Sequence, residues 1–334
     1  MVNGNRPDEP LLRVEDLRTY FYTRTGVVKA VDGISFDLYP GETLGIVGES
    51  GSGKSMTAWS ILGLVPKPAG RIVGGRILYK GQNLLEASAS EMRQVRGSGI
   101  CMVMQDPLTS LNPVFTIGNQ LIESLHMEFK GPTAKLRKMA AELLAKVSIP
   151  SPETRLNAFP HELSGGMRQR VVGAIAMSRS PNVLIADEPT TSLDATVQLQ
   201  YLNLLKEIQE TTGTAIIFIT HDLGIVARMC DRVAVMYAGR FVEQADVMAL
   251  FDSPSHPYTQ ALMRSVPDLD EDVSHLPSIE GQPPSLDDLP PGCAFAPRCE
   301  YASEECEVYP PSFAIANGHI SSCWRHSGEY SVAD

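Results

Sequence analysis

Residues 48–55 have the composition and spacing of a loop that binds phosphate groups. They fit the pattern G-x-x-x-x-G-K-[ST], follow an apolar run and precede a segment with helical character. Glycines let backbone N–H groups turn toward a phosphate, and a helix N-terminus adds the positive end of its dipole. Lys54 is expected to reach the β- and γ-phosphates of a nucleotide, and the Ser55 hydroxyl to bind Mg²⁺. The residues assigned to nucleotide binding here are Gly48, Glu49, Ser50, Gly51, Ser52, Gly53, Lys54, Ser55 and Met56.

A second apolar run, residues 182–186, ends in the carboxylates Asp187 and Glu188. Buried parallel strands have this pattern, and ligands bind at their carboxyl ends. Asp187 is therefore the candidate for the Mg²⁺ side of the site. Glu188 is the candidate for the base that orients a water in line with the γ-phosphate.

Four of the six cysteines gather near the end of the chain, at Cys293, Cys299, Cys306 and Cys323. Five, six and sixteen residues separate them, so there is no C-x-x-C pair. Structural zinc sites usually contain a short chelating loop, whereas a four-iron cluster tolerates looser spacing. The proline-rich tail can build only a small hydrophobic core, which favours a metal staple. A structural [4Fe-4S] cluster is the preferred interpretation, with Zn²⁺ or free thiols as alternatives.

The redox environment of these thiols follows from the rest of the chain. The N-terminal residues lack the apolar segment of a signal peptide, and no apolar run approaches the about 18 residues that span a bilayer. We therefore expect a cytoplasmic protein with reduced thiols, which favours a metal over disulfides. Cys101 and Cys230 lie in apolar runs and are expected in the core.

Charge is distributed unevenly along the 334 residues. The net charge is −11, but residues 241–334 contain three Arg, no Lys and sixteen acidic residues, a charge of −13, and residues 1–240 carry +2. Such a tail repels nucleic acid and anionic lipid, so no nucleic acid partner is expected. The length allows two domains, or one domain with an appendage.

The elements that position these groups follow from the pattern of apolar residues. Residues 11–80 alternate apolar and polar positions, which predicts an antiparallel subdomain. Residues 88–180 are helix-rich, and residues 181–240 return to strand–helix alternation, as a parallel sheet requires. The tail follows all of these elements. We expect the phosphate loop and the signature to fold around their own sheet, so that losing the staple affects nucleotide hydrolysis less than it affects the tail.

Residues 163–170, LSGGMRQR, resemble the signature of the ATP-binding-cassette (ABC) ATPases, with Met167 in place of the usual Gln. Ser164, Gly165 and Gly166 open a helix, which suits a γ-phosphate. The resemblance implies that this helix completes the ATP site of a second subunit in a head-to-tail dimer. It also implies a P-loop NTPase fold of the cassette type, α/β, with a RecA-like core, an antiparallel β subdomain and a helical subdomain.

Other cassette landmarks have counterparts in this chain. The resemblance assigns Gln105 to the loop that touches Mg²⁺ or water and faces a membrane partner. It assigns Asp194 to the loop after the catalytic strand and His221 to contact with the γ-phosphate. One aromatic ring is expected to stack on adenine, and Phe21 is favoured over Tyr22 for this role. A place in the hydrophobic core is the alternative for both residues.

Two segments are similar to the ATPases of dipeptide and oligopeptide importers. They are residues 105–113, QDPLTSLNP, and residues 255–262, SHPYTQAL, in which Pro257 is expected to start a helix. The implied domains are 1–10 as an N-terminal tail, 11–250 as the ATPase domain with a helical subdomain at about 88–180, and 251–334 as the cysteine-containing extension. Some members of this branch carry an iron–sulfur cluster, which the resemblance implies here.

The resemblance also implies partners. These are a second ABC ATPase subunit, the same or homologous, two membrane permease subunits and, indirectly, an extracytoplasmic peptide-binding protein. The chain is then peripheral, at the cytoplasmic face of the membrane. A nickel or other small-solute importer ATPase is one alternative. A soluble DNA-repair-type ABC ATPase with a metal module is another, although the acidic tail and the lack of an inserted DNA-binding domain argue against it.

Overall fold

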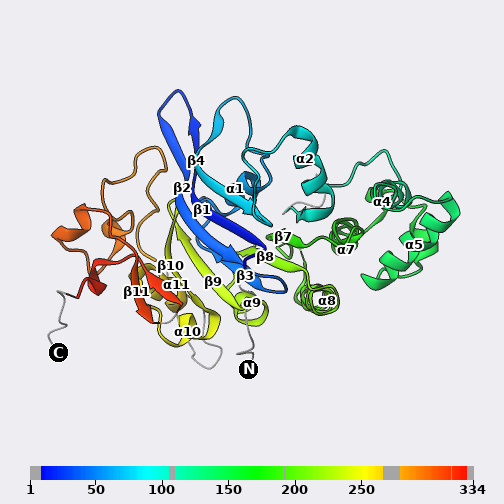
Figure 1. Cartoon of the computed structure of the whole chain (residues 1–334). Helices are drawn as coiled ribbons and strands as arrows, with labels where there is room; N and C mark the ends of the chain where they lie inside the picture. Colours follow the sequence, from blue (N-terminus) through cyan, green and yellow to red (C-terminus); the bar gives the residue numbers. More distant parts are fainter. Residues whose placement is uncertain (1–8, 105–109, 192, 266–278, 317, 329–334) are drawn as a thin grey trace. The chain divides into compact units, whose positions relative to one another are not determined.

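The computed structural model describes residues 9–104, 110–191, 193–265, 279–316 and 318–328. The described chain forms two compact units (Figure 1). We call residues 39–42 and 87–218 the helical unit, and residues 9–38, 43–86 and 219–328 the strand-rich unit. The strand-rich unit therefore combines an early and a late part of the described chain.

The helical unit contains most of the helices, as the sequence predicted. Its elements are α2 (Ala89–Gln94), η1 (Val95–Gly99), β6 (Ile100–Val103), α4 (Ile117–His126), α5 (Thr133–Lys146), α6 (Pro152–Arg155), η2 (Pro160–Glu162), α7 (Gly165–Met177), β7 (Val183–Asp187), α8 (Ala195–Thr212) and most of β8 (Ala215–Thr220). Helix α5 has the expected spacing, with Leu136, Ala140 and Leu144 buried along one face. Strands β6 and β7 run parallel, and β8 follows β7 in the sheet.

The strand-rich unit contains the antiparallel sheet that the N-terminal pattern predicted. Its four strands lie in the order β2 (Val27–Leu38), β1 (Leu12–Tyr22), β4 (Gly70–Tyr79) and β5 (Gln82–Asn83). Along β1 and β2, buried positions alternate with more exposed ones over much of the length, because successive side chains of a strand point to opposite faces.

A second group of strands in this unit carries the phosphate loop. Strand β3 (Thr43–Val47) runs parallel to β9 (Arg232–Tyr237), and β10 (Arg240–Asp246) pairs antiparallel with β9. Two short strands of the tail, β12 (His319–Ser321) and β11 (Phe313–Ala316), continue the order beyond β10. The tail thus adds two strands to the same sheet as β3, the strand that leads into the phosphate loop.

Short helices complete the unit: α1 (Lys54–Ile61), α9 (Leu223–Met229), α10 (Val247–Asp252), α11 (Pro257–Arg264) and the 3₁₀ turns η3 (Ala296–Arg298), η4 (Glu304–Glu307) and η5 (Trp324–His326). Helix α11 begins at Pro257, as predicted, and the His256 ring accepts a hydrogen bond from the backbone N–H of Tyr258. Proline suits the first helical position because its missing N–H would have no partner there.

Candidate nucleotide site and cysteine cavity

The phosphate loop follows β3 directly and leads into α1, which is the strand–loop–helix arrangement that the motif requires. Two of its glycines cannot be replaced without moving the backbone. A Cβ atom on Gly48 would lie 2.1 Å from the carbonyl oxygen of Met236, and one on Gly53, at φ +108°, would lie 2.2 Å from that of Ala30. The loop is therefore packed against β9 and β2.

Lys54 is buried at the start of α1, with 5% of its surface exposed. Its Nζ atom donates hydrogen bonds to the carbonyl oxygens of Gly48 and Glu49, at 2.7 and 2.8 Å. The Ser52 hydroxyl is buried, and among the described residues it has no hydrogen-bond partner. A buried polar atom of this kind fits a loop that binds a phosphate oxygen, because such atoms normally have a partner.

The two candidate adenine-stacking rings lie at the end of β1, in the same unit as the loop. Phe21 is half-buried and pairs with Gly70 of β4, whose missing side chain leaves room for the ring. Tyr22 is 49% exposed, and the guanidinium of Arg71 lies 5.6 Å from its ring centre. His221, also in this unit, follows β8 and is exposed.

The other candidate residues lie in the helical unit. Asp187 is buried at the end of β7. Glu188 follows it at φ +44°, an uncommon backbone conformation for a residue other than glycine, and its Oε2 accepts a hydrogen bond of 3.0 Å from the Thr191 hydroxyl. Strained residues of this kind cluster at functional sites. Asp194 caps α8 by accepting a hydrogen bond from the N–H of Val197 at 3.0 Å.

The signature residues form the exposed start of α7. Ser164 is the N-cap, and its hydroxyl accepts a hydrogen bond from the N–H of Met167 at 3.3 Å. A Cβ atom on Gly165 would meet nothing within 4 Å, so this side of the helix start is open. Gln105 lies outside the described residues, so its assigned role stays a prediction.

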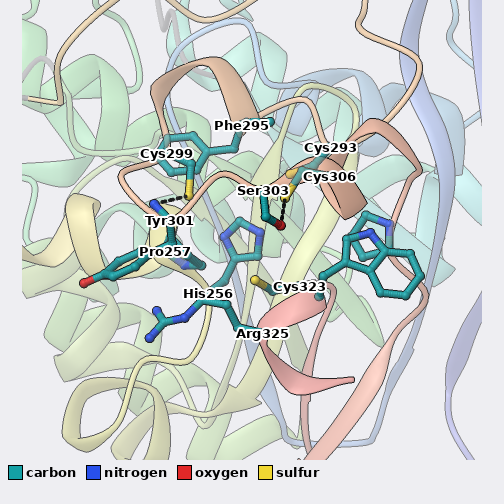
Figure 2. A pocket seen from close by; sticks show the side chains of 13 residues that line it. His256, Pro257, Cys293, Phe295, Cys299, Tyr301, Ser303, Cys306, Cys323 and Arg325 are labelled. Carbon is teal, nitrogen blue, oxygen red and sulfur yellow. Dashed lines mark hydrogen bonds between the residues drawn. The ribbon is translucent and has the colours of Figure 1, made fainter. Parts of the chain in front are cut away.

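The four C-terminal cysteines come together around one cavity of about 30 Å³, together with His256 and Phe295 (Figure 2). The backbone links two of them, because the N–H of Cys293 donates to the carbonyl of Cys306 at 2.8 Å. All six cysteines are free thiols. Within the described residues, no group of three or more His, Cys, Asp or Glu side chains is arranged to hold a metal ion.

Burial changes the acidity of these thiols. Burial, together with the charges of neighbouring cysteines, raises the pKa of Cys293 and Cys299 above the ordinary value and the pKa of Cys323 to about 11. Cys230 is buried, as expected, and Cys101 is half-buried. A cation bound in the cavity would favour the thiolate form of Cys293, Cys299 and Cys323.

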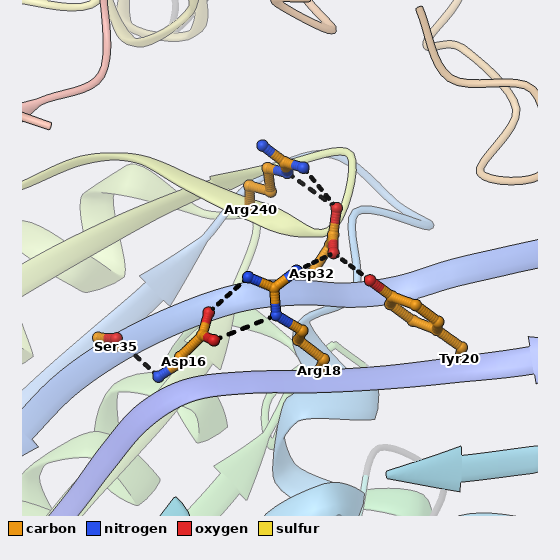
Figure 3. Close-up of polar contacts among 6 residues, drawn as sticks. All are labelled: Asp16, Arg18, Tyr20, Asp32, Ser35 and Arg240. Atoms are coloured by element: carbon orange, nitrogen blue, oxygen red, sulfur yellow. Dashed lines mark hydrogen bonds and ion pairs between the residues drawn. The ribbon is translucent and has the colours of Figure 1, made fainter. Parts of the chain in front are cut away.

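A buried carboxylate joins β1, β2 and β10 (Figure 3). Asp32 accepts hydrogen bonds from the Tyr20 hydroxyl at 2.5 Å and from Nη2 of Arg240 at 2.6 Å, and Arg18 lies 3.5 Å away. Burial alone would raise the pKa of Asp32, but these hydrogen bonds outweigh it, and the pKa lies below its ordinary value. Arg240 also stacks on the ring of Tyr309 in the tail, at 3.9 Å. The strand that carries Phe21 is therefore linked to the tail.

Sequence reasoning missed a direct connection between the tail and the phosphate loop. The Arg298 guanidinium pairs with the Glu49 carboxylate at 2.8 Å, and the Tyr258 hydroxyl accepts a hydrogen bond from the N–H of Glu49 at 2.9 Å. The expectation that the phosphate loop folds around a sheet of its own is therefore wrong, because the tail contacts the loop and adds strands to the same sheet. One signal was present: Arg298 is one of only three cationic residues in an acidic tail and stands between two cysteines.

Comparisons with known proteins give consistent results. Residues 31–191 match the ABC transporter family, and residues 242–306 match the C-terminal region of oligopeptide/dipeptide transporters. The chain is 51% identical to a probable peptide ABC transporter ATP-binding protein, y4tR, of Sinorhizobium fredii, covering 97% of both chains. It is 49% identical to the dipeptide transport ATP-binding protein DppD of Bacillus subtilis, covering 95% of both.

Solved structures show the same fold. The cbiO1 subunit of a Clostridium perfringens ABC transporter complex matches with a TM-score of 0.62 and 30% identity, over 74% of this chain and 92% of that one. The ATP-binding cassette MJ0796, solved as a dimer with ADP and Pi, matches with a TM-score of 0.64 and 24% identity, over 71% and 98%. Within the described ranges, no helix combines the length and apolar character needed to cross a membrane.

Proposed function

Because this chain belongs to the ATP-binding proteins of the ABC transporter family, we propose that it is the ATP-hydrolysing subunit of a membrane importer of dipeptides and oligopeptides. The observation that carries the choice of cargo is the match of residues 242–306 to the C-terminal region of oligopeptide/dipeptide transporters, and this region also contacts the phosphate loop. Tyr258, in the SHPYTQAL segment, accepts a hydrogen bond from the N–H of Glu49. The C-terminal region thus packs within the strand-rich unit, in contact with the phosphate loop.

The site residues have separate roles in this proposal. Lys54 and the loop N–H groups hold the phosphates, Ser55 and Asp187 hold Mg²⁺, and Phe21 or Tyr22 stacks on adenine. Glu188 orients the attacking water and accepts its proton. His221 contacts the γ-phosphate, and Gln105 contacts Mg²⁺ or water. Bound ATP supplies the phosphoryl group that water attacks. The buried Ser52 hydroxyl, which has no partner in the part of the chain that the structure describes, and the close-packed glycines of the loop support this assignment.

A head-to-tail dimer completes each site in this proposal. Ser164, Gly165 and Gly166 of one subunit face the γ-phosphate held by its partner, and Asp194 lies near the same contact. The start of α7 supports this role, because a Cβ atom on Gly165 would meet nothing within 4 Å and a helix N-terminus favours an anion. The partner is a second copy of this chain or a homologous ATPase subunit.

Replacing Ser164 with arginine tests the dimer. The Ser164→Arg homodimer is expected to lose at least about tenfold in ATP hydrolysis, because a bulky cation obstructs closure, while the lost N-cap costs only about 1 kcal/mol of stability. Steady-state hydrolysis and thermal unfolding measure the two effects. Ser88→Arg is the matched control, since Ser88 caps α2 in the same unit and has no proposed role. If Ser164→Arg kept the turnover of the parent, the proposed head-to-tail dimer would be refuted.

The remaining partners are two membrane permease subunits and, indirectly, an extracytoplasmic peptide-binding protein. The chain is then peripheral, at the cytoplasmic face of the membrane. We assign residues 1–10 to an N-terminal tail, 11–250 to the ATPase domain, with its helical subdomain at about 88–180, and 251–334 to the peptide-importer extension.

Reconstitution of the chain with the two permease subunits in vesicles tests the cargo: dipeptides should accumulate in the vesicles and stimulate ATP hydrolysis. Accumulation of Ni²⁺ instead would favour the small-solute alternative.

The four thiols of the extension are proposed to hold a structural [4Fe-4S] cluster, with Zn²⁺ as the alternative. The donor chemistry fits either metal, because Cys293, Cys299, Cys306 and Cys323 line one cavity. Burial disfavours the thiolate form of three of them, Cys293, Cys299 and Cys323, whose pKa values are raised, and a bound cation would offset this penalty. The cluster would tie the loops of the tail together.

Anaerobic purification is expected to yield brown protein that contains iron and acid-labile sulfide. Cys299→Ser should bleach the colour and increase protease cleavage between residues 280 and 328, because one corner of the staple is lost. Cys101→Ser is the matched control and should keep the colour, since Cys101 lies outside the cavity. Colourless protein with one equivalent of zinc would overturn the iron assignment, and protein without metal would overturn both.

A further inference from the structure

Arg298 and Glu49 form a two-pronged ion pair between the cysteine-bearing tail and the phosphate loop. The Nη1 and Nη2 atoms of Arg298 lie 2.8 and 3.1 Å from the two carboxylate oxygens of Glu49. The Arg298 side chain is only 4% exposed, and that of Glu49 is 26% exposed. Paired contacts of this geometry are stronger than single hydrogen bonds and also fix orientation.

Every nitrogen of the Arg298 guanidinium has a partner. Besides Glu49, the group donates to the carbonyl of Glu280 at 2.9 Å, to the carbonyl of Ile279 at 3.2 Å and to the Tyr237 hydroxyl at 3.2 Å. Because these contacts surround the planar group, the guanidinium has one well-defined position.

Glu49 is held through its backbone as well as its carboxylate. Its N–H donates to the Tyr258 hydroxyl, and its carbonyl accepts from Lys54. Tyr258 is fully buried and packs against Tyr237 and Phe295, with ring centres 4.5 and 5.4 Å away. The C-terminal region therefore sets the position of the first residue after Gly48 in the phosphate loop.

The turn η3, which carries Arg298, lies in the sequence between two thiols of the cysteine cavity, Cys293 and Cys299. The N–H of Ala296 donates to the carbonyl of Cys293 at 3.0 Å, and the N–H of Cys299 donates to that of Ala296 at 3.1 Å. Arg298 therefore lies on a short turn whose two flanking cysteines, Cys293 and Cys299, line the cavity.

We propose that Arg298 is a positioning residue for ATP binding, acting through Glu49: it neutralises a carboxylate beside the phosphate cradle and fixes the start of the loop. This inference rests on the proposed function only in taking the loop as the ATP site. Without Arg298, the Glu49 charge would repel the triphosphate, which weakens binding more than it slows the chemical step.

The first experiment measures ATP affinity and turnover of the full-length protein. Arg298→Ala is expected to raise the Kd and KM for ATP about tenfold, while kcat at saturating ATP changes less than about threefold. Arg264→Ala is the matched control, because Arg264 pairs with Glu300 in the same region and neither residue contacts the phosphate loop. An effect of Arg298→Ala no larger than that of Arg264→Ala would overturn the proposal.

The second experiment separates action through Glu49 from general loosening of the tail. In a Glu49→Gln background there is no carboxylate to neutralise, so Arg298→Ala should then weaken ATP binding less than about threefold. An undiminished tenfold loss in that background would show a structural effect only and overturn the inference. Arg298→Gln, uncharged but still able to donate hydrogen bonds, takes its place if the alanine variant does not fold. Failure of the parent protein to bind ATP would instead count against the proposed function.

Discussion

Replacing Glu188 with glutamine is expected to lower steady-state ATP hydrolysis at least about a hundredfold while ATP binding is retained. Glutamine has the shape of glutamate and can still accept the hydrogen bond from Thr191, so the backbone at φ +44° keeps its support. It cannot accept a proton from the attacking water. A hundredfold loss corresponds to about 2.7 kcal/mol of barrier, within the range that a general base supplies.

The same variant should accumulate as a closed dimer in ATP, because binding proceeds and turnover does not. Hydrolysis assays and size-exclusion chromatography with ATP measure the two effects. Glu142→Gln is the matched control: this residue is exposed on α5 in the same unit, and its turnover should equal that of the parent. If Glu188→Gln kept turnover within a few-fold of the parent, Glu188 would not be the base.

Unlike Glu188→Gln, which should still bind ATP, Lys54→Ala is expected to be impaired in ATP binding itself, with an affinity loss of about a hundredfold. The buried ammonium group already lies against the loop, where it donates to the carbonyls of Gly48 and Glu49, and it is the cation placed to meet the phosphates. Its removal takes away charge-assisted hydrogen bonds, which are roughly twice as strong as neutral ones. Equilibrium binding of ATP measures the loss directly.

The control for Lys54→Ala must distinguish lost binding from a collapsed loop. Thermal unfolding of the variant reports the cost of leaving two loop carbonyls without their donor. Lys138→Ala removes an exposed lysine from α5 and should leave ATP affinity unchanged. Parental ATP affinity in Lys54→Ala would contradict the assignment of the phosphate loop.

The sequence predicted those local structures that depend on neighbouring residues. The phosphate loop, the helix that follows it and the Ser164 cap of α7 each lie within one short segment, where spacing and residue type dictate local geometry. The same holds for α11, which begins at Pro257 as its sequence indicates. Gln105 stays a prediction, since it lies outside the described residues.

By itself, the sequence determined the phosphate loop, the strand–helix alternation and the antiparallel sheet, because these follow from periodicity and local backbone preferences. Only the tertiary structure decided which distant residues meet. Arg298 reaches Glu49 across 249 positions, and β12 of the tail pairs with β10. Cysteine spacing suggested one site, but the folded chain places all four thiols at one cavity and the turn between two of them against the nucleotide loop. Local patterns carry no information on such pairings, since those depend on how the strands and turns of the unit pack together.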